Sequence, residues 1–253
     1  MKVLITAGGT VEKIDNVRSI TNISTGRLGS AIASEFSRSA VIDEIFYLCS
    51  KSAILPQSEK TTIIYIDSVA NLENTITEIL SGVDIDIIVH SMAVSDYRVK
   101  TISSVSNIAK GVISKIRLLT TEPEFICALN EAAYEAAICD NGKINSSIDD
   151  MLLFMERTPK IISMFHKLTP RSVLVGFKLL DSVPLETLIS AGVRVLEENK
   201  CSFVLANDLK DVNDNYHIGY LIDENRSFTK YEGRNEIAAA IVAYTIQKRR
   251  NGQ

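Results

Sequence analysis

The sequence has no apolar run that approaches the roughly 18 residues needed to cross a bilayer. Its first residues, MKVLITAGGT, do not form a signal-peptide pattern, because they carry one lysine and only a very short apolar stretch. The four cysteines show no CxxC spacing and the three histidines are not paired, which argues against a zinc site and against a disulfide scaffold. Together these absences predict a cytoplasmic protein that does not associate with a membrane.

A strong excess of charge of one sign is also missing. The chain has 27 Lys and Arg against 31 Asp and Glu, which gives a formal net charge of −4. The sequence therefore offers no electrostatic reason to expect nucleic acid or an anionic membrane as a partner. With 46% hydrophobic and 23% charged residues, the 253-residue chain is typical of a globular protein that can bury a large core.

Short continuous apolar runs alternate along the chain with segments of helical periodicity, such as Leu28, Ile32 and Phe36. Continuous runs are typical of parallel strands that are buried on both faces. The alternation predicts a Rossmann-like, doubly wound α/β fold, with a mostly parallel sheet and helices on both faces. The predicted strands are Val3–Ile5, Ile45–Cys49, Ile63–Ile66, Ile85–Val89, Val173–Phe177 and Phe203–Ala206.

One region departs from this alternation. From about Arg98 to Asn145, stretches rich in Ser and Thr surround one helical piece, Phe125–Cys139. We predict a single α/β domain over residues 1–253, in which 98–145 is an inserted or mobile region over a site, with a surface decoration as the alternative. Further along, a turn cluster leads into a late pair of strands, His217–Ile222 and Ser227–Tyr231.

Glycine clusters follow the first predicted strand and precede the first predicted helix. Ligands of open α/β sheets bind beyond the carboxyl ends of the strands, where glycine lets backbone N–H groups approach a phosphate. Free N–H groups at a helix N-terminus also favour an anion, although serine and threonine there are equally suited to capping the helix. The predicted phosphate-binding residues are Gly8, Gly9, Ser24, Thr25 and Gly26.

Neither glycine cluster has the spacing of a common nucleotide-binding motif. The pattern is not G-x-G-x-x-G, the dinucleotide fingerprint, and it is not the P-loop pattern G-x-x-x-x-G-K-[ST]. The second predicted strand continues into Cys49-Ser50-Lys51, without an acidic residue that would bind a ribose 2′-hydroxyl. The sequence therefore disfavours NAD, whereas NADP bound through Lys51 stays open.

Other polar and aromatic residues are predicted to lie at the same edge of the sheet. A loop of about twenty residues, Glu12–Gly29, contains Arg18, which is suited to binding a carboxylate or phosphate. Asp96 follows the fourth strand and is a candidate metal ligand or base-reading residue, with a turn cap as the alternative. Phe177 ends a later strand, where its ring either stacks on a base or joins the core. Asn207 ends the sixth strand, and His90 is interpreted as a core histidine.

In this order, the segments resemble phosphopantothenate–cysteine ligase, also called phosphopantothenoylcysteine synthetase, in the stand-alone form of some Gram-positive bacteria. The resemblance covers nearly the whole chain, and its most specific piece is Val17–Gly29. The region Arg98–Asn145 is less similar. The other matching pieces are Thr6–Thr10, Ala93–Tyr97, Gly142–Ile144, Thr158–Ile161, Gly176-Phe177 and Ala206–Asp208.

The resemblance implies an enzyme of coenzyme A biosynthesis. Such an enzyme activates the carboxylate of 4′-phosphopantothenate with CTP, or with ATP in eukaryotes, and releases pyrophosphate. The amine of L-cysteine then attacks the acyl-nucleotide intermediate, and 4′-phosphopantothenoylcysteine is formed. The resemblance also implies Mg²⁺ as a partner of the nucleotide and a homodimer, with the late strand pair as a candidate interface. No flavin is expected, because the flavin-dependent decarboxylase domain of the fused form is not in this sequence.

The resemblance also assigns roles to single residues. Lys143 is implied as the catalytic lysine of acyl-nucleotide formation, and Asn22 as the residue of the second step. Arg18, Asn22 and Ala93 are implied to bind phosphopantothenate. The nucleotide would be bound by the glycine clusters together with Asp96, Phe177 and Asn207, and Asp96 is the candidate Mg²⁺ ligand.

Two other functions stay open on the residues alone. An NADP-dependent oxidoreductase would also have an α/β pattern, but it does not explain the glycine spacing. The sequence has two Tyr-x-x-x-Lys pairs, Tyr47–Lys51 and Tyr244–Lys248, and neither is interpreted as the proton-transfer pair of a short-chain reductase. A non-catalytic nucleotide-binding module would bind CTP or ATP without turnover, and the residues alone do not separate it from an enzyme.

Overall fold

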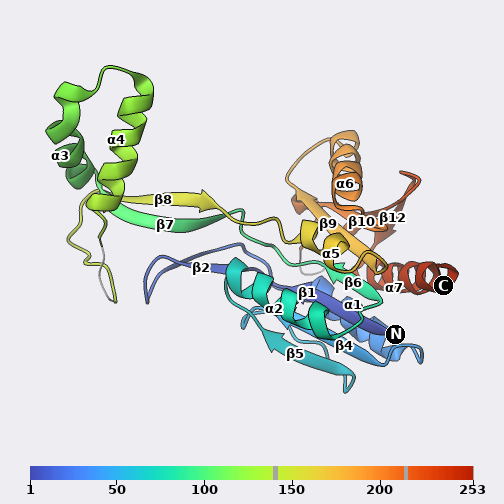
Figure 1. Ribbon diagram of the computed structural model, residues 1–253. Helices are drawn as coiled ribbons and strands as arrows, with labels where there is room; N and C mark the ends of the chain where they lie inside the picture. Colours follow the sequence, from blue (N-terminus) through green and yellow to red (C-terminus); the bar gives the residue numbers. More distant parts are fainter. Residues whose placement is uncertain (139–141, 214–215, 253) are drawn as a thin grey trace. The chain divides into compact units, whose positions relative to one another are not determined.

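The computed structural model describes residues 1–138, 142–213 and 216–252 (Figure 1). Within it the chain forms two compact units. The second unit is larger than the predicted inserted region 98–145. It also includes residues 11–21, and a strand that follows residue 145 and pairs with the strand that begins at Tyr97. Unit 1 comprises Met1–Thr10, Asn22–Val94 and Lys160–Gln253, and unit 2 comprises Val11–Thr21 and Ser95–Pro159.

An eight-stranded, mostly parallel sheet forms the centre of unit 1. Its order is β12-β11-β10-β9-β6-β1-β4-β5, so the direction in which the chain adds strands reverses between β1 and β6. This order confirms the predicted Rossmann-like, doubly wound fold. The strands are β1 (Lys2–Ala7), β4 (Glu44–Cys49), β5 (Thr61–Tyr65), β6 (Ile87–His90), β9 (Val173–Leu180) and β10 (Phe203–Asp208), followed by the antiparallel β11 (Ile218–Asp223) and β12 (Phe228–Glu232).

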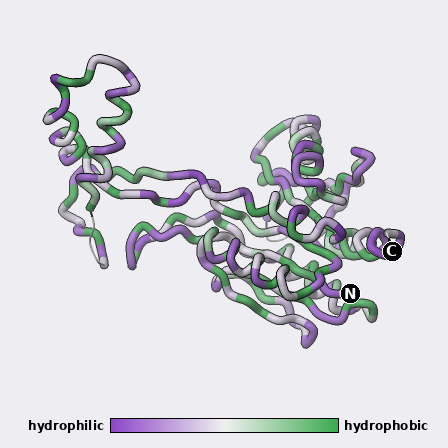
Figure 2. Tube along the Cα trace, in the orientation of Figure 1, coloured by the Kyte–Doolittle hydropathy of each residue, from purple (hydrophilic) through white to green (hydrophobic). Residues whose placement is uncertain are grey.

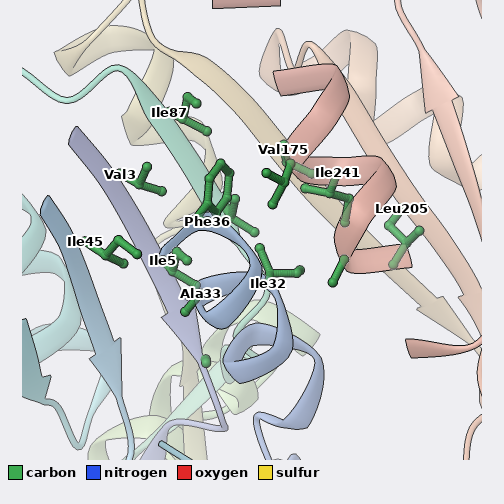
Figure 3. Close-up of a cluster of buried hydrophobic side chains, with 14 of the residues drawn as sticks. Val3, Ile5, Ile32, Ala33, Phe36, Ile45, Ile87, Val175, Leu205 and Ile241 are labelled. Carbon is green, nitrogen blue, oxygen red and sulfur yellow. The ribbon is translucent and has the colours of Figure 1, made fainter. Parts of the chain in front are cut away.

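Helices cover both faces of this sheet. Neighbouring side chains of β1 point to opposite faces, so that Val3 and Ile5 belong to one buried cluster and Leu4 to the other. Figure 3 shows the first cluster, in which Phe36 and Ile241 pack with the β1 side chains. Burial on both faces explains why the strands are continuous apolar runs, which appear as hydrophobic segments in Figure 2. One face carries α1 (Arg27–Arg38) and α7 (Arg234–Asn251), and the other α2 (Val69–Gly82), α5 (Ile162–Leu168) and α6 (Leu185–Asn199).

Unit 2 is built on a two-stranded antiparallel ribbon of β7 (Tyr97–Ser104) and β8 (Met151–Arg157). Between these strands the chain forms α3 (Val105–Lys115), a 3₁₀ turn η1 (Ile116–Leu118) and α4 (Glu122–Glu135), and α3 packs against α4. The predicted helix Phe125–Cys139 begins three residues earlier, because Thr121 and Glu124 form a capping box, and Cys139 lies outside the described residues. None of the helices in the described parts of the chain is both long and apolar enough to span a bilayer.

The predicted loop Glu12–Gly29 is partly regular structure. Its first half forms a short antiparallel hairpin of β2 (Val11–Lys13) and β3 (Ser19–Thr21), which belongs to unit 2. The rest of the segment returns to unit 1 and leads into α1. The prediction of an irregular loop was wrong for the hairpin, because strands of three residues are too short for periodicity to reveal.

Candidate functional site

A cavity of about 420 Å³ opens in unit 1 at the carboxyl ends of β6, β9 and β10, beside the start of α1. Doubly wound sheets bind ligands at this edge, next to the point where the strand order reverses. The volume is within the range of small-molecule sites. The lining residues are Ile23–Gly29, Ser91–Ala93, Phe177, Leu179, Asn207, Leu209, Val212, Asn213, His217 and Arg234.

The start of α1 forms one wall of this cavity. Gly26 occupies the N-cap position with a φ of 67°, and no side chain caps the helix. Glycine is needed there because of this left-handed φ, and because a Cβ atom would lie 3.1 Å from the backbone nitrogen of Gly8. The alternative interpretation, in which Ser24 or Thr25 caps the helix, is not observed, and both residues line the cavity. With Arg27 in its first turn, this helix end is suited to an anion.

Gly8 and Gly9 lie beneath this wall and do not line the cavity. The backbone nitrogen of Ala93 donates to the oxygen of Gly8 at 2.9 Å, and Ala93 itself lines the cavity, while its role in substrate binding stays a prediction. A Cβ atom on Gly9 would lie 2.2 Å from the carbonyl oxygen of Asn22, so only glycine permits this close approach. The two glycines therefore hold the segment before α1 against the sheet edge. The side chain of Asn22 is exposed and outside the cavity lining.

The opposite wall comes from the ends of β9 and β10 and from the segments beyond them. Phe177 lines the cavity and also packs against the core, and its stacking on a base stays a prediction. Asn207 is buried at the end of β10 and faces the cavity, as predicted for a residue at this edge. The site thus brings together Phe177 and Asn207 with Ser24, Thr25 and Gly26 from the phosphate-binding prediction.

The sequence analysis missed His217 and Arg234 on this wall. His217 immediately precedes β11, and Arg234 follows β12. Because β11 runs antiparallel to β10 and β12 antiparallel to β11, the start of β11 and the end of β12 return to the ligand-binding edge. The predicted late pair of strands could have indicated this position. When a hairpin pairs with the last parallel strand, the start of its first strand and the end of its second strand lie near the carboxyl end of that parallel strand.

Two buried histidines in unit 1 have low pKa values for the same reason. Burial lowers the pKa of His90 to about 4, and its Nδ1 shares a hydrogen bond of 2.8 Å with the hydroxyl of Thr6. Its ring also packs edge-on against Phe165, which confirms the core interpretation. Burial, together with the charge of Arg234, lowers the pKa of His217 to about 4. Both imidazoles are therefore neutral at pH 7.

In unit 2, Arg18 is bonded to an internal partner. Its Nη2 lies 2.6 Å from Oδ2 of Asp15 and donates to the carbonyl oxygen of Ile144 at 2.9 Å. The guanidinium of Arg18 holds the pKa of the Asp15 carboxyl well below its usual range, and backbone N–H groups that donate to the carboxylate add to this effect. In this structure Arg18 therefore contacts a carboxylate of the chain itself, that of Asp15. The role of Arg18 in binding phosphopantothenate stays a prediction.

The same contacts hold the segment that carries Lys143. The backbone nitrogen of Ile144 donates to Oδ2 of Asp15 at 3.1 Å, and the nitrogen of Asn16 donates to the carbonyl oxygen of Gly142 at 3.2 Å. Ile144 is buried, whereas the side chain of Lys143 between them is exposed. We call Asp15, Arg18 and the backbone of 142–144 the hairpin clamp. It fixes the backbone on both sides of Lys143 and leaves its ammonium group accessible.

The candidate metal ligand Asp96 also belongs to unit 2, where its side chain is exposed and its carbonyl oxygen accepts a hydrogen bond from Thr158 at 3.0 Å. Among the residues that the structure describes, no group of three or more His, Cys, Asp or Glu side chains is placed to hold a metal ion. Mg²⁺ is often bound by one or two carboxylates together with substrate phosphates, so one carboxylate fits this ion only alongside a nucleotide.

Comparison with known proteins shows what the chain is similar to. Residues 1–133 match the model of a family described as the DNA/pantothenate metabolism flavoprotein C-terminal domain. The chain is 32% identical over 209 residues to the coenzyme A biosynthesis bifunctional protein CoaBC of Thermococcus kodakarensis, a match that covers 83% of this chain and 41% of that protein. A match at 25% identity to CoaBC of Methanocaldococcus jannaschii covers 49% of that protein. The chain thus spans about half the length, or less, of these curated relatives.

Solved structures resemble the chain over almost its full length. A crystal structure of the DNA/pantothenate metabolism flavoprotein from Streptococcus pneumoniae is 31% identical, with a TM-score of 0.78, and the match covers 98% of this chain and 99% of that one. The C-terminal domain of a CoaBC protein has the same fold at 19% identity and a TM-score of 0.67. These matches confirm the resemblance seen in the sequence motifs.

Proposed function

The chain belongs to the DNA/pantothenate metabolism flavoprotein C-terminal domain family, and on that premise we propose that it is a phosphopantothenate–cysteine ligase. The enzyme would join 4′-phosphopantothenate and L-cysteine in coenzyme A biosynthesis, with CTP or ATP as co-substrate. The observation that carries the proposal is the cavity at the sheet edge. One wall is an uncapped helix start suited to phosphate, and the other combines the ring of Phe177 with the polar side chains of Asn207, His217 and Arg234.

The proposed reaction needs a nucleotide because a carboxylate does not react with an amine at neutral pH. In the first step a carboxylate oxygen of phosphopantothenate attacks the α-phosphorus of the nucleotide, and pyrophosphate leaves. In the second step the amine of cysteine attacks the acyl carbon, the nucleoside monophosphate leaves, and the amine loses a proton. The protein contributes by holding the reactants together and by stabilising the negative charge that develops on the phosphates.

In this proposal the phosphates of the nucleotide contact one wall of the cavity, and its nucleoside contacts the other. The backbone N–H groups at the start of α1, which no side chain caps, bind the phosphates, assisted by Ser24, Thr25 and the charge of Arg27. Gly8 and Gly9 allow the segment before α1 to pack closely against the end of β1. Phe177 stacks on the nucleoside and Asn207 hydrogen-bonds to it, which places the uncharged part of the nucleotide along the apolar wall.

The remaining roles are carried by the family resemblance. Lys143 serves acyl-nucleotide formation, and Asn22 holds the acyl carbonyl and the incoming amine in the second step. Arg18 and Ala93 serve phosphopantothenate binding. Asp96 is the chain's contribution to binding Mg²⁺, which supplies further neutralisation of the phosphate charge when bound.

We also propose that the enzyme is a homodimer in the cytoplasm and binds no flavin. Exposed apolar side chains on unit 2 support self-association, among them Ile113 and Leu118, which are 65% and 78% exposed. The late strand pair, in which β12 is an edge strand, was the interface predicted from the sequence and is a second candidate contact surface. Light scattering coupled to gel filtration measures the subunit number, and an absorbance spectrum of the purified protein reports any bound flavin.

The NADP-dependent alternative has little support at this site. Lys51, on which it depends, is exposed and does not belong to the cavity lining that the described residues form. A non-catalytic nucleotide-binding module shares the cavity with the ligase, and it differs only in turnover.

The deciding experiment measures pyrophosphate release with Mg²⁺, phosphopantothenate and cysteine, in separate reactions with CTP and ATP. We expect release that depends on phosphopantothenate, together with the mass of phosphopantothenoylcysteine in the product. The nucleotide that supports faster release identifies the preference. Nucleotide binding without pyrophosphate release from a folded sample would contradict the proposal and favour the binding module, and NADPH oxidation would favour the oxidoreductase.

A further inference from the structure

The cavity wall formed by β10 and β11 contains a buried side chain to which the described parts of the chain offer no hydrogen-bond partner. His217 is 4% exposed and lines the cavity. Neither of its ring nitrogens makes a hydrogen bond to any of the residues that the structure describes. Buried polar atoms in folded proteins are normally hydrogen-bonded, because an unpaired buried donor or acceptor costs free energy. Two unpaired nitrogens on one ring at a ligand cavity therefore point to a ligand as their partner.

The backbone around His217 fixes the position of the ring. The residue forms an antiparallel bridge with Val212, and its carbonyl oxygen accepts a hydrogen bond of 2.7 Å from the nitrogen of Gly233. Arg234, the next residue, donates from Nη2 to the carbonyl oxygen of Asn213 at 2.9 Å. His217 is thus held through its main chain by both neighbouring segments of the cavity wall, and the described residues supply no hydrogen-bond partner for its ring nitrogens.

The environment also determines which form of the ring a ligand meets. With a pKa of about 4, caused by burial and by the charge of Arg234, the imidazole is neutral at pH 7. A neutral imidazole offers one N–H donor and one acceptor nitrogen. Phosphate oxygens only accept hydrogen bonds when ionised, so a phosphate would leave the acceptor nitrogen unpaired. Nucleobases and ribose hydroxyl groups supply both donors and acceptors.

We propose that His217 binds the uncharged nucleoside part of the nucleotide, and so contributes to the selection of the nucleotide. This inference rests on the proposed function, since it requires a nucleotide in the cavity. Phe177 and Asn207 line the same wall, and Leu209 and Val212 add apolar surface that suits a base or a ribose. Arg234 also lies on this wall, where its Nη2 donates to the carbonyl oxygen of Asn213. The phosphates are bound at the start of α1, where N–H groups are free to donate.

The test compares nucleotide affinity of the full chain and its variants by isothermal titration calorimetry. We expect His217→Ala to weaken binding of the preferred nucleotide by about fivefold to twentyfold, as loss of one or two neutral hydrogen bonds predicts. His217→Gln should recover part of the affinity, because an amide also offers a donor and an acceptor. Inorganic tripolyphosphate, which has no nucleoside, should bind equally to all forms. His166→Ala, which removes a histidine outside the cavity lining, is the matched control.

Nucleotide analogues then locate the contact within the nucleoside. If 2′- or 3′-deoxynucleotides bind equally to the wild type and His217→Ala, the contact is with that hydroxyl group. If the loss persists with deoxynucleotides, the contact is with the base. Either result supports the proposal.

Three results would overturn it. Unchanged nucleotide affinity in both His217 variants would show that the ring makes no contact, while the proposed function would stand. An equal loss for tripolyphosphate would indicate a general disturbance of the cavity instead of a nucleoside contact, and thermal unfolding of His217→Gln would identify that disturbance. A wild-type protein that binds no nucleotide would overturn the proposed function together with this inference.

Discussion

The two units of the chain differ in how their structure is stabilised. In unit 1 both faces of the sheet are buried under helices, and side chains such as Val3, Ile5 and Phe36 have no exposed surface. In the described part of unit 2, the buried hydrophobic cluster consists of Ile108, Val112 and Ala132, with a few partly buried neighbours. Because burial of apolar surface supplies most of the stability of a fold, unit 1 is the more stable unit.

Polar contacts take a larger part in unit 2. Arg98 pairs with Glu156 across the ribbon, and Lys115 pairs with Glu131 between α3 and α4, in both cases near the surface. Exposed ion pairs of this kind contribute about 0–1 kcal/mol each. We therefore expect unit 2 to open locally at a lower free energy than unit 1. The candidate cavity therefore belongs to the unit with the larger buried core, whereas the predicted catalytic residue Lys143 belongs to the unit with the smaller one.

Truncation of a core side chain in each unit tests the comparison most strongly. Phe36→Ala removes a ring that is fully buried between α1 and the sheet, and we expect a loss of about 3–5 kcal/mol in the free energy of unfolding. Ile108→Ala in the small cluster of unit 2 should cost less, since the surrounding side chains are only partly buried. Urea unfolding of both variants measures the difference. Equal losses in the free energy of unfolding would contradict the expected difference in stability between the two units.

The second prediction separates chemistry from stability. Lys143→Ala should reduce pyrophosphate release by at least about 100-fold, because a positive charge that stabilises the transferred phosphate is lost. The lysine side chain is exposed, so the free energy of unfolding should stay unchanged. Lys51→Ala, an equally exposed lysine in unit 1, is the matched control and should retain activity. Normal release from Lys143→Ala would exclude the proposed role of this lysine.

Acid should destabilise unit 1 through its buried histidines. The pKa of His90 is lowered from 6.5 to about 4 by burial, so the folded state disfavours its protonation. The unfolded chain binds that proton below pH 6.5, and stability therefore falls as the pH decreases from 6.5 towards 4. At pH 5 this histidine alone accounts for a loss of about 2 kcal/mol relative to pH 7. Urea unfolding of His90→Asn at both pH values should show a smaller loss than the wild type.

The carboxylate of the hairpin clamp behaves differently in the same range. The pKa of Asp15 is held well below its usual value, chiefly by Arg18, so its contribution to stability is present above the normal aspartate pKa and is lost only under stronger acid. Between pH 7 and pH 5 the clamp should therefore stay intact while unit 1 weakens. Amide hydrogen exchange that accelerates at Ile144 over this range would contradict this expectation.

The smallest predicted effect comes from the clamp itself. Asp15→Asn removes the charge opposite Arg18 but keeps a side-chain oxygen that accepts from the Ile144 nitrogen. We expect exchange of the Ile144 amide to accelerate about tenfold, and exchange in β1 to stay unchanged. The substitution also frees the guanidinium of Arg18. A lower KM for phosphopantothenate in this variant would support the predicted role of Arg18 as a substrate-binding residue.

Much of unit 1 was predictable because its pattern is local. Continuous apolar runs gave the six parallel strands, and the periodicity of Leu28, Ile32 and Phe36 gave α1. Phe177 and Asn207, which now line the cavity, were predicted at the ligand-binding edge because parallel strands of one sheet end at the same edge, whereas Ala93 was assigned through the family resemblance. The contact of Arg18 with Asp15 was missed, since charged residues three positions apart contact each other only when the turn between them has a suitable conformation.

The sequence by itself determined the strand and helix alternation, the order of the glycine clusters and the family, since each of these depends on residues that are close together in the chain. Tertiary structure alone decided that Gly26 leaves α1 uncapped and that His217 and Arg234 reach the cavity. Those two residues come to the ligand-binding edge through β11 and β12, whose direction depends on hydrogen bonds to distant strands. Local periodicity does not contain that direction, so the folded sheet is needed to complete the site.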